Sequence, residues 1–236
     1  MSAPLTTKLR QDPPSLHGQG NYFGLGWPAL EWIERTVTPE MTTLETGSGG
    51  STIVFAATGS DHTAISPAAE EHERLAAWCE HEGISTERVH FIAEPSHEAL
   101  LRTWYAQPLD LVLIDGAHGF PYPALDWFLT AQHLKIGGHV VLDDAFLPSV
   151  NMVVRYLRDS ADWEMLPPLG YRTVAFRKLG DDISFDWLGS RFDRRPRFDY
   201  LKPGPRLVAL ARHHLIDTSP RGARLLARVR RGRGRA

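Results

Sequence analysis

Short apolar runs alternate with longer helical patterns through the middle of this chain. Five runs rich in β-branched and aliphatic residues predict strands, at 42–44, 62–65, 89–92, 111–114 and 139–142. The segments between them predict helices, at 51–57, 68–82, 97–105 and 122–134. Strands that alternate with crossover helices are typical of a parallel sheet covered by helices.

Two more predicted strands follow, at 163–166 and 173–176. The segment between them holds Pro167, Pro168 and Gly170 and is too short for a crossover helix, which favours an antiparallel hairpin. We therefore predict an α/β fold: a doubly wound, mostly parallel seven-stranded sheet with an antiparallel C-terminal hairpin.

Segments of different character flank the sheet region. Residues 1–40 form an N-terminal arm and a cap helix, which Pro28 opens and which runs to Val37 with Leu30 and Ile33 on its inward face. Such a helix is suited to lie over the ligand edge of the sheet. We predict the following division of the chain: the arm and cap helix 1–40, the sheet domain 41–179, a C-terminal extension 180–220 with a helix at 206–216, and an Arg-rich flexible tail 221–236.

Composition narrows the class of protein. With 236 residues, 42% of them hydrophobic and 23% charged, the chain can bury one sizeable core. No apolar run approaches the roughly 20 residues that a membrane span needs, and the first 15 residues do not resemble a signal peptide. The single cysteine, Cys79, excludes an intramolecular disulfide framework. We expect a soluble, intracellular, cytoplasmic protein without a membrane span.

The net charge of −2 hides an uneven distribution. Seven arginines lie between Arg221 and Arg235, and no acidic residue follows Asp217. Without them, the remaining Lys and Arg are well outnumbered by the 28 Asp and Glu, so the body is acidic. An acidic body disfavours a nucleic-acid partner.

A glycine-rich loop directly follows the first predicted strand. It comprises Glu45, Thr46, Gly47, Ser48 and Gly49, and it opens the first helix. In an open α/β sheet, ligands bind at the carboxyl ends of strands, and glycines let backbone N–H groups approach them. The loop lacks the lysine of a phosphate-binding loop and the last glycine of the dinucleotide fingerprint. A turn whose glycines serve geometry alone is the alternative.

This segment resembles the first motif of the Rossmann-like S-adenosylmethionine (SAM)-dependent methyltransferases, an acidic residue followed by Gly-x-Gly. The resemblance implies that Glu45, Gly47, Ser48 and Gly49 bind SAM. Members of that family usually end the second strand with an acid that holds the ribose; here Ser66 takes its place. Ser96, after the third strand, is in the zone that borders the adenine, and it is also a suitable helix cap.

Acidic residues follow the fourth and fifth predicted strands. Asp115 ends the fourth strand and precedes His118 by three positions, and Asp143 and Asp144 end the fifth. Adjacent parallel strands would bring the three carboxylates to one edge, where a divalent cation such as Mg²⁺ would relieve their repulsion. A helix-capping or turn role is the alternative for Asp143 or Asp144 taken singly.

The sequence Asp-Gly-Ala-His at 115–118, the later Asp126, then Leu134, the glycines at 137–138 and the closing Asp-Asp resemble the metal-dependent O-methyltransferases of the macrocin and catechol type. The resemblance implies that Asp115, Asp143 and Asp144 hold a metal. It also implies that Asp115 contacts SAM, and that Asp115 or His118 accepts the hydroxyl proton.

Three functions are compatible with these observations. The first is a SAM-dependent, metal-assisted O-methyltransferase that acts on a small hydroxylated acceptor such as a sugar or a phenol. The second is a nucleic-acid methyltransferase recruited by the arginine tail, and the third is a non-catalytic protein of the same fold. The acidic body and the Asp-Gly-Ala-His sequence disfavour the second. A homo-oligomer is compatible with the sequence.

Overall fold

The computed structural model describes residues 4–16, 24–102, 107–180, 192 and 197–212. The chain divides into two units, Met1–Phe185 and Asp186–Ala236. In the second unit the described helix is α8, Pro203–Arg212, on which Leu207 and Val208 are exposed. The predicted tail 221–236 and most of the predicted extension lie outside the described residues. No helix among the described residues is long and apolar enough for a membrane span.

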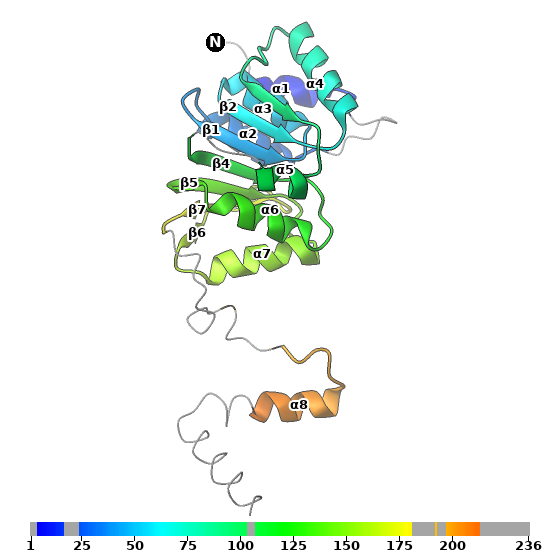
Figure 1. Ribbon diagram of the computed structural model, residues 1–236, viewed down its shortest axis with the longest axis vertical. Helices are drawn as coiled ribbons and strands as arrows, with labels where there is room; N and C mark the ends of the chain where they lie inside the picture. The colour runs from blue at the N-terminus through cyan, green and yellow to red at the C-terminus, as the bar shows by residue number, and fades with distance from the viewer. Residues whose placement is uncertain (1–3, 17–23, 103–106, 181–191, 193–196, 213–236) are drawn as a thin grey trace, which may run out of the picture. The chain divides into compact units, whose positions relative to one another are not determined.

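The first unit is built on one seven-stranded sheet, with the order β3-β2-β1-β4-β5-β7-β6 (Figure 1). Its strands are β1 Thr42–Thr46, β2 Asp61–Ile65, β3 Val89–Ile92, β4 Leu109–Ile114, β5 Leu134–Leu142, β6 Trp163–Met165 and β7 Val174–Lys178. The first five are parallel, and β7 pairs antiparallel with both β5 and β6. The predicted α/β fold and its C-terminal hairpin are confirmed.

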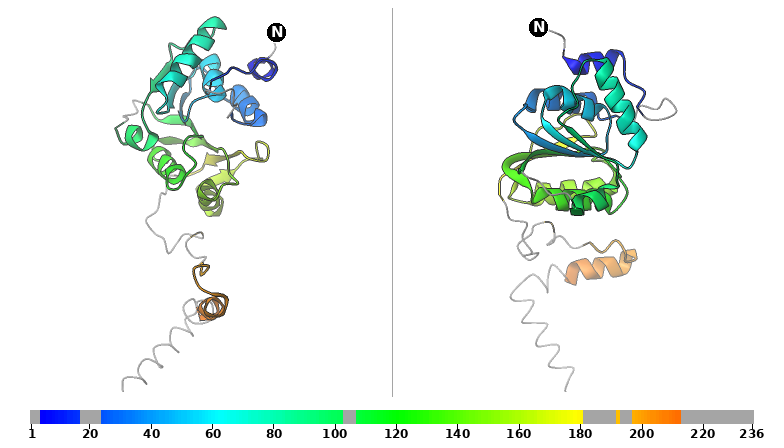
Figure 2. Two further views of the ribbon diagram at one scale, coloured as in Figure 1. Left: turned by 90° about the vertical axis from the view of Figure 1, so that its right-hand side faces the viewer. Right: turned by 45° about the horizontal axis from the view of Figure 1, so that its top comes forward.

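Helices cover both faces of this sheet (Figure 2). They are α1 Leu5–Gln11, α2 Trp27–Thr36, α3 Gly50–Thr58, α4 Ala69–His81, α5 Ser96–Arg102, α6 Tyr122–Ala131 and α7 Pro148–Asp159. Buried side chains form two clusters, one with α1 to α4 and one with α5 to α7. Along β4, Leu111 and Leu113 face the first cluster, and Val112 and Ile114 face the second. This alternation is the two-residue period of a strand that is buried on both sides.

Two helices were not predicted, and one was predicted too long. Helix α7 has buried residues at Val150, Val153, Val154 and Leu157, a regular helical spacing. Helix α6 ends at Ala131, before the predicted end at 134, because β5 already begins there.

The other unpredicted helix, α1, is short, and a contact with α2 stabilises it. The Glu34 carboxylate accepts hydrogen bonds from the backbone N–H groups of Leu5 and Thr6 and from the Thr6 hydroxyl. These are N–H groups that a helix leaves unpaired at its start. The cap helix α2 is confirmed: Leu30 and Ile33 are fully buried against the first cluster.

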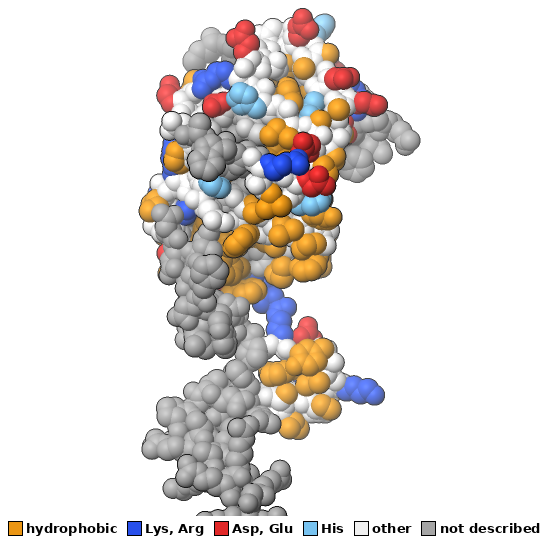
Figure 3. Space-filling model, viewed as in Figure 1, with side chains coloured by type: hydrophobic (Ala, Val, Ile, Leu, Met, Phe, Trp, Pro, Cys, Tyr) orange, Lys and Arg blue, Asp and Glu red, His pale blue; other side chains and the backbone are white. Residues whose placement is uncertain are grey.

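Apolar side chains are also exposed on the helices that cover the second cluster. Leu101 on α5 and Leu125 and Phe128 on α6 are exposed, and Figure 3 shows hydrophobic side chains gathered over this side of the unit.

Candidate functional site

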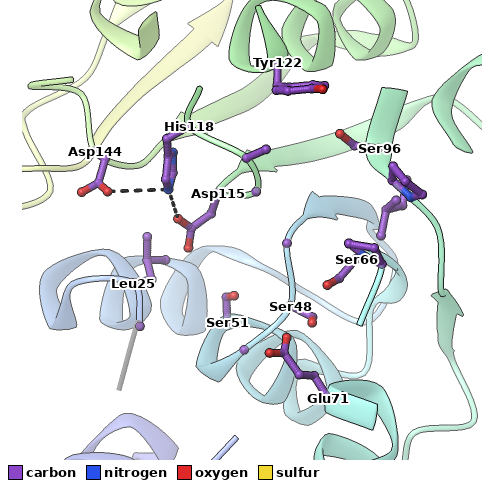
Figure 4. Close-up of a pocket in the computed structure, with 18 of the residues that line it drawn as sticks. Leu25, Ser48, Ser51, Ser66, Glu71, Ser96, Asp115, His118, Tyr122 and Asp144 are labelled. Atoms are coloured by element: carbon purple, nitrogen blue, oxygen red, sulfur yellow. Dashed lines mark ion pairs between the residues drawn. The ribbon is translucent and has the colours of Figure 1, made fainter. Parts of the chain in front are cut away.

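A cavity of about 720 Å³ opens where the order of the strands reverses, between the loops after β1 and β4. This is the place where open α/β sheets bind ligands, and the volume is in the range of small-molecule sites. It is lined by residues of the loops that follow β1 to β5 and that precede α2 and β7, by residues of α3, α4, α5 and α6, and by the end of β2 (Figure 4). Among them are Gly24, Leu25, Gly47, Ser48, Gly49, Ser66, Glu71, Ser96, Asp115, His118, Tyr122, Asp144 and Arg172.

The glycine loop is held tightly against the loop that follows β4. Gly47 has φ +99°, and a Cβ on it would lie 2.5 Å from the carbonyl oxygen of Asp115. The Gly47 N–H also donates to the carbonyl of Ile65, 2.8 Å away. Glycine at position 47 therefore has a geometric reason, since no side chain fits there.

The same loop presents polar groups to the cavity. Gly49 and Ser48 line it, and the Ser48 hydroxyl oxygen is buried without a hydrogen-bond partner among the described residues. Buried polar groups are normally paired, so this hydroxyl fits a ligand that would complete it. Gly50 and Ser51, at the start of α3, also line the cavity, where unpaired helix N–H groups favour an anionic group.

Glu45 does not line the cavity, which corrects its predicted direct contact with the cofactor. Its carboxylate is fully buried beneath the loop and accepts hydrogen bonds from the hydroxyls of Ser51, at 2.6 Å, and Thr52. His62 Nε2 lies 3.2 Å from the same carboxylate. Glu45 thus ties β1 to the first turn of α3 and fixes the shape of the loop from behind.

The predicted ribose and adenine residues both reach the cavity. Ser66 follows β2 and Ser96 begins α5, and both line the wall on the far side of the glycine loop from His118 (Figure 4). Glu71, in the first turn of α4, lines the cavity near Ser66, and the sequence analysis did not predict it. It is an acidic residue six positions after the end of β2, whereas the acid that holds the ribose usually lies at the strand end itself.

His118 lies between two carboxylates at the other end of the cavity (Figure 4). Its Nε2 is 3.6 Å from Asp115 Oδ1 and 3.6 Å from Asp144 Oδ2. Both distances exceed a hydrogen bond, so Nε2 is free of a short contact with either acid. Asp144 adopts a left-handed backbone conformation, with φ 50°. Strained backbone of this kind is concentrated at functional sites.

Asp115 is a carboxylate whose ionised form is disfavoured. Burial raises its pKa well above the ordinary value, and the charges of Asp143 and Glu45 raise it further, against an opposing effect of Arg172. A carboxylate with a raised pKa is a stronger base than an exposed one.

Asp143 does not join Asp115 and Asp144 as predicted. It is fully buried and outside the cavity lining, and its oxygens accept hydrogen bonds from the Thr173 hydroxyl and from two nitrogens of Arg172. No group of three or more His, Cys, Asp or Glu among the described residues is arranged to hold a metal ion. The predicted metal site of Asp115, Asp143 and Asp144 therefore does not fit this structure, because a guanidinium already pairs with two of its three acids.

Comparison with known proteins identifies the domain. Residues 44–145 match the family model described as a methyltransferase domain. No curated protein sequence matches the chain.

The fold is also found in solved structures. An O-methyltransferase from Bacillus cereus in complex with SAH has a TM-score of 0.58 at 13% identity, over 76% of this chain and 92% of that one. TomG from Streptomyces achromogenes, an O-methyltransferase in complex with SAM, has 0.54 at 18%, again over 76% and 92%. An rRNA methylase from Streptococcus thermophilus has 0.51 at 15%, over 64% and 95%.

Proposed function

We propose that this chain, an enzyme with a class I methyltransferase domain that resembles O-methyltransferases, transfers the methyl group of SAM to a hydroxyl of a small molecule. The observation that carries the proposal is the position of His118. This residue lines the glycine-loop cavity, and its Nε2 lies 3.6 Å from each of two carboxylates.

The residues of the cavity fit SAM. The Ser48 hydroxyl, for which the described part of the chain offers no partner, and the start of α3 suit the amino-acid part, whose carboxylate would lie near helix N–H groups. Glu71 and Ser66 suit the ribose hydroxyls, and Ser96 lines the wall beyond them. Gly47 and Gly49 keep this volume free of side chains. When bound, SAM supplies a methyl group on a sulfonium, which is transferred by in-line displacement.

His118 and its neighbours supply the base. A hydroxyl is a weak nucleophile at neutral pH, and a positioned base removes its proton as the new bond forms. Nε2 of His118 accepts that proton, and the carboxylates of Asp115 and Asp144 stabilise the imidazolium. If His118 is not the base, Asp115 is the next candidate, because its raised pKa makes it a stronger base than an ordinary carboxylate.

Aromatic side chains next to these residues in sequence suit an acceptor with an apolar ring. Phe120, Phe146 and Tyr171 are all well exposed, and the rings of Phe146 and Tyr171 are stacked with centroids 6.5 Å apart. Each follows or precedes a residue of the cavity by one or two positions. Exposed aromatic faces stack on flat apolar groups, which favours a phenol-like acceptor if these rings border the cavity that their neighbours line.

Methyl transfer from labelled SAM to a panel of hydroxylated compounds tests the proposal. With an accepted compound, His118→Asn should lower turnover by about 100- to 10,000-fold, the usual contribution of a positioned base. SAM affinity, measured by calorimetry, should change little. The matched control is His81→Asn, because His81 is an exposed histidine on α4 outside the cavity. Full turnover of His118→Asn would refute the assigned base, and failure of the wild-type protein to bind SAM would refute the function.

A nucleic-acid acceptor is the second candidate. The seven arginines of the tail favour it, since clustered arginine neutralises phosphates. Labelled RNA in the same assay, with the full chain and with a chain that ends at Pro220, distinguishes the two. Methylation of RNA that depends on the tail would support this candidate over a small molecule.

A further inference from the structure

Arg172 reaches the site from the antiparallel part of the sheet. In the pairing of β5 with β7, Leu142 lies opposite Val174. Continuing this register places Arg172 opposite Asp144, and the N–H of the next residue, Ala145, donates to the carbonyl of Arg172 over 2.8 Å. The fold therefore fixes an arginine across from the two acids that end β5.

The guanidinium of Arg172 binds both of these acids. Nη2 lies 2.5 Å from Asp143 Oδ2 and 2.8 Å from Asp144 Oδ1, and Nε donates to Asp143 Oδ1 over 3.3 Å. The paired nitrogens on Asp143 form the two-pronged geometry that makes Arg–carboxylate pairs strong. The other oxygen of Asp144 faces His118, so Asp144 links the guanidinium to the proposed base.

The charge of Arg172 is permanent. Burial opposes it, but the hydrogen bond and charge of Asp143, with the charges of Asp144 and Asp115, outweigh burial and raise the pKa of Arg172 above its ordinary value. A divalent ion at these acids would meet the guanidinium at short range, and it would have to displace it to reach Asp143.

We propose that Arg172 is the built-in cation of this site and takes the place that a divalent metal holds in metal-dependent O-methyltransferases. It neutralises Asp143 and Asp144, holds Asp144 toward His118, and makes the site unsuited to Mg²⁺ or Mn²⁺. The consequence for catalysis, methyl transfer that chelators do not stop, rests on the proposed function. The prediction that the site does not bind a divalent metal ion is independent of that function.

The test therefore begins with metal binding alone. Mn²⁺ is titrated into the full-length protein, and binding is measured from the loss of the free-ion signal in electron paramagnetic resonance. The wild-type protein should leave the signal of free Mn²⁺ unchanged. The variant Arg172→Ala frees the carboxylates of Asp143 and Asp144 beside Asp115, and it should bind Mn²⁺ at least about tenfold more tightly than the wild type.

Arg177→Ala is the matched control. Arg177 lies on β7, five positions after Arg172, outside the cavity, and it pairs with the exposed Glu164. This variant should behave as the wild type does. Should Arg172→Ala fold poorly, Mn²⁺ should raise its melting temperature but not that of Arg172→Lys, which keeps a positive charge.

Tight Mn²⁺ binding by the wild-type protein would overturn the proposal, as would an Arg172→Ala variant that binds no more Mn²⁺ than Arg177→Ala. With an acceptor in hand, undiminished turnover in EDTA is expected. Turnover that EDTA abolishes and Mg²⁺ restores would also overturn it, while leaving the methyltransferase function intact.

Discussion

Replacing Gly47 with alanine tests whether the cavity depends on close packing of two backbone loops. The new Cβ would lie 2.5 Å from the carbonyl oxygen of Asp115 and 3.0 Å from its carbonyl carbon. Both atoms belong to the backbone of the loop after β4, so they cannot rotate away as a side chain can. The variant must separate the loops that follow β1 and β4.

The magnitude follows from two costs. A left-handed φ costs a non-glycine residue about 1–2 kcal/mol, and overpacking at a buried contact adds about 1–3 kcal/mol. Gly83 provides the matched control, because it has φ +70° but no atom within 4 Å of an added Cβ. Gly83→Ala should therefore show the first cost alone, and Gly47→Ala both.

Urea denaturation of the two variants measures the difference, which should be about 1–3 kcal/mol in the free energy of unfolding. For a domain of this size that corresponds to a melting temperature lower by about 2–12 °C. Gly47→Ala should also weaken SAM binding in calorimetry, whereas Gly83→Ala should not. Equal losses of stability in the two variants would refute the packing argument.

Three further predictions concern buried groups. Because the raised pKa of Asp115 makes its ionised form destabilising, the stability of the protein should fall as pH rises from the ordinary carboxyl range through the folded-state pKa. Asp115→Asn should therefore unfold at a higher urea concentration than the wild type at pH 7 but not at pH 3.5. Equal urea midpoints at pH 7 would contradict this. Lys178→Met removes an ammonium that donates to the carbonyls of Ala131, at the end of α6, and Leu134, at the start of β5. It should cost about 2–4 kcal/mol in unfolding measurements, against less than about 1 kcal/mol for the exposed Lys135→Met. Burial raises the pKa of the Cys79 thiol to about 11, so iodoacetamide should label it only after unfolding, as measured by mass spectrometry. Rapid labelling of the native protein would contradict this and would show that α4 opens.

Local sequence patterns were sufficient to predict most of the sheet. Its strands are short apolar runs bounded by polar or glycine residues, and these features depend on neighbours in the sequence. The hairpin was predictable for the same reason, since too few residues separate β6 from β7 for a helix. Helix α7 had a readable spacing of valines and a proline at its start, so its omission was avoidable. Helix α1 was not, because its first N–H groups depend on Glu34, about thirty residues away.

The residues of the site also divide into those that the sequence could identify and those that it could not. Residues at the ends of β1 and β4 were identifiable, because the carboxyl ends of adjacent parallel strands meet at one edge. The sequence could not show that Glu45 turns beneath the glycine loop, nor that Glu71 on α4 reaches the cavity that the end of β2 borders.

By itself the sequence determined the class of fold, the edge of the sheet where the cavity lies, and the candidate pair Asp115 and His118. Only the tertiary structure decided which charge balances the acids of that edge. Arg172 is 28 positions beyond Asp144, in an unremarkable stretch after Gly170, and nothing local marks it as part of the site. Antiparallel pairing brings it opposite Asp144, and at that distance a fixed guanidinium replaces the metal ion that the spacing of the aspartates had suggested.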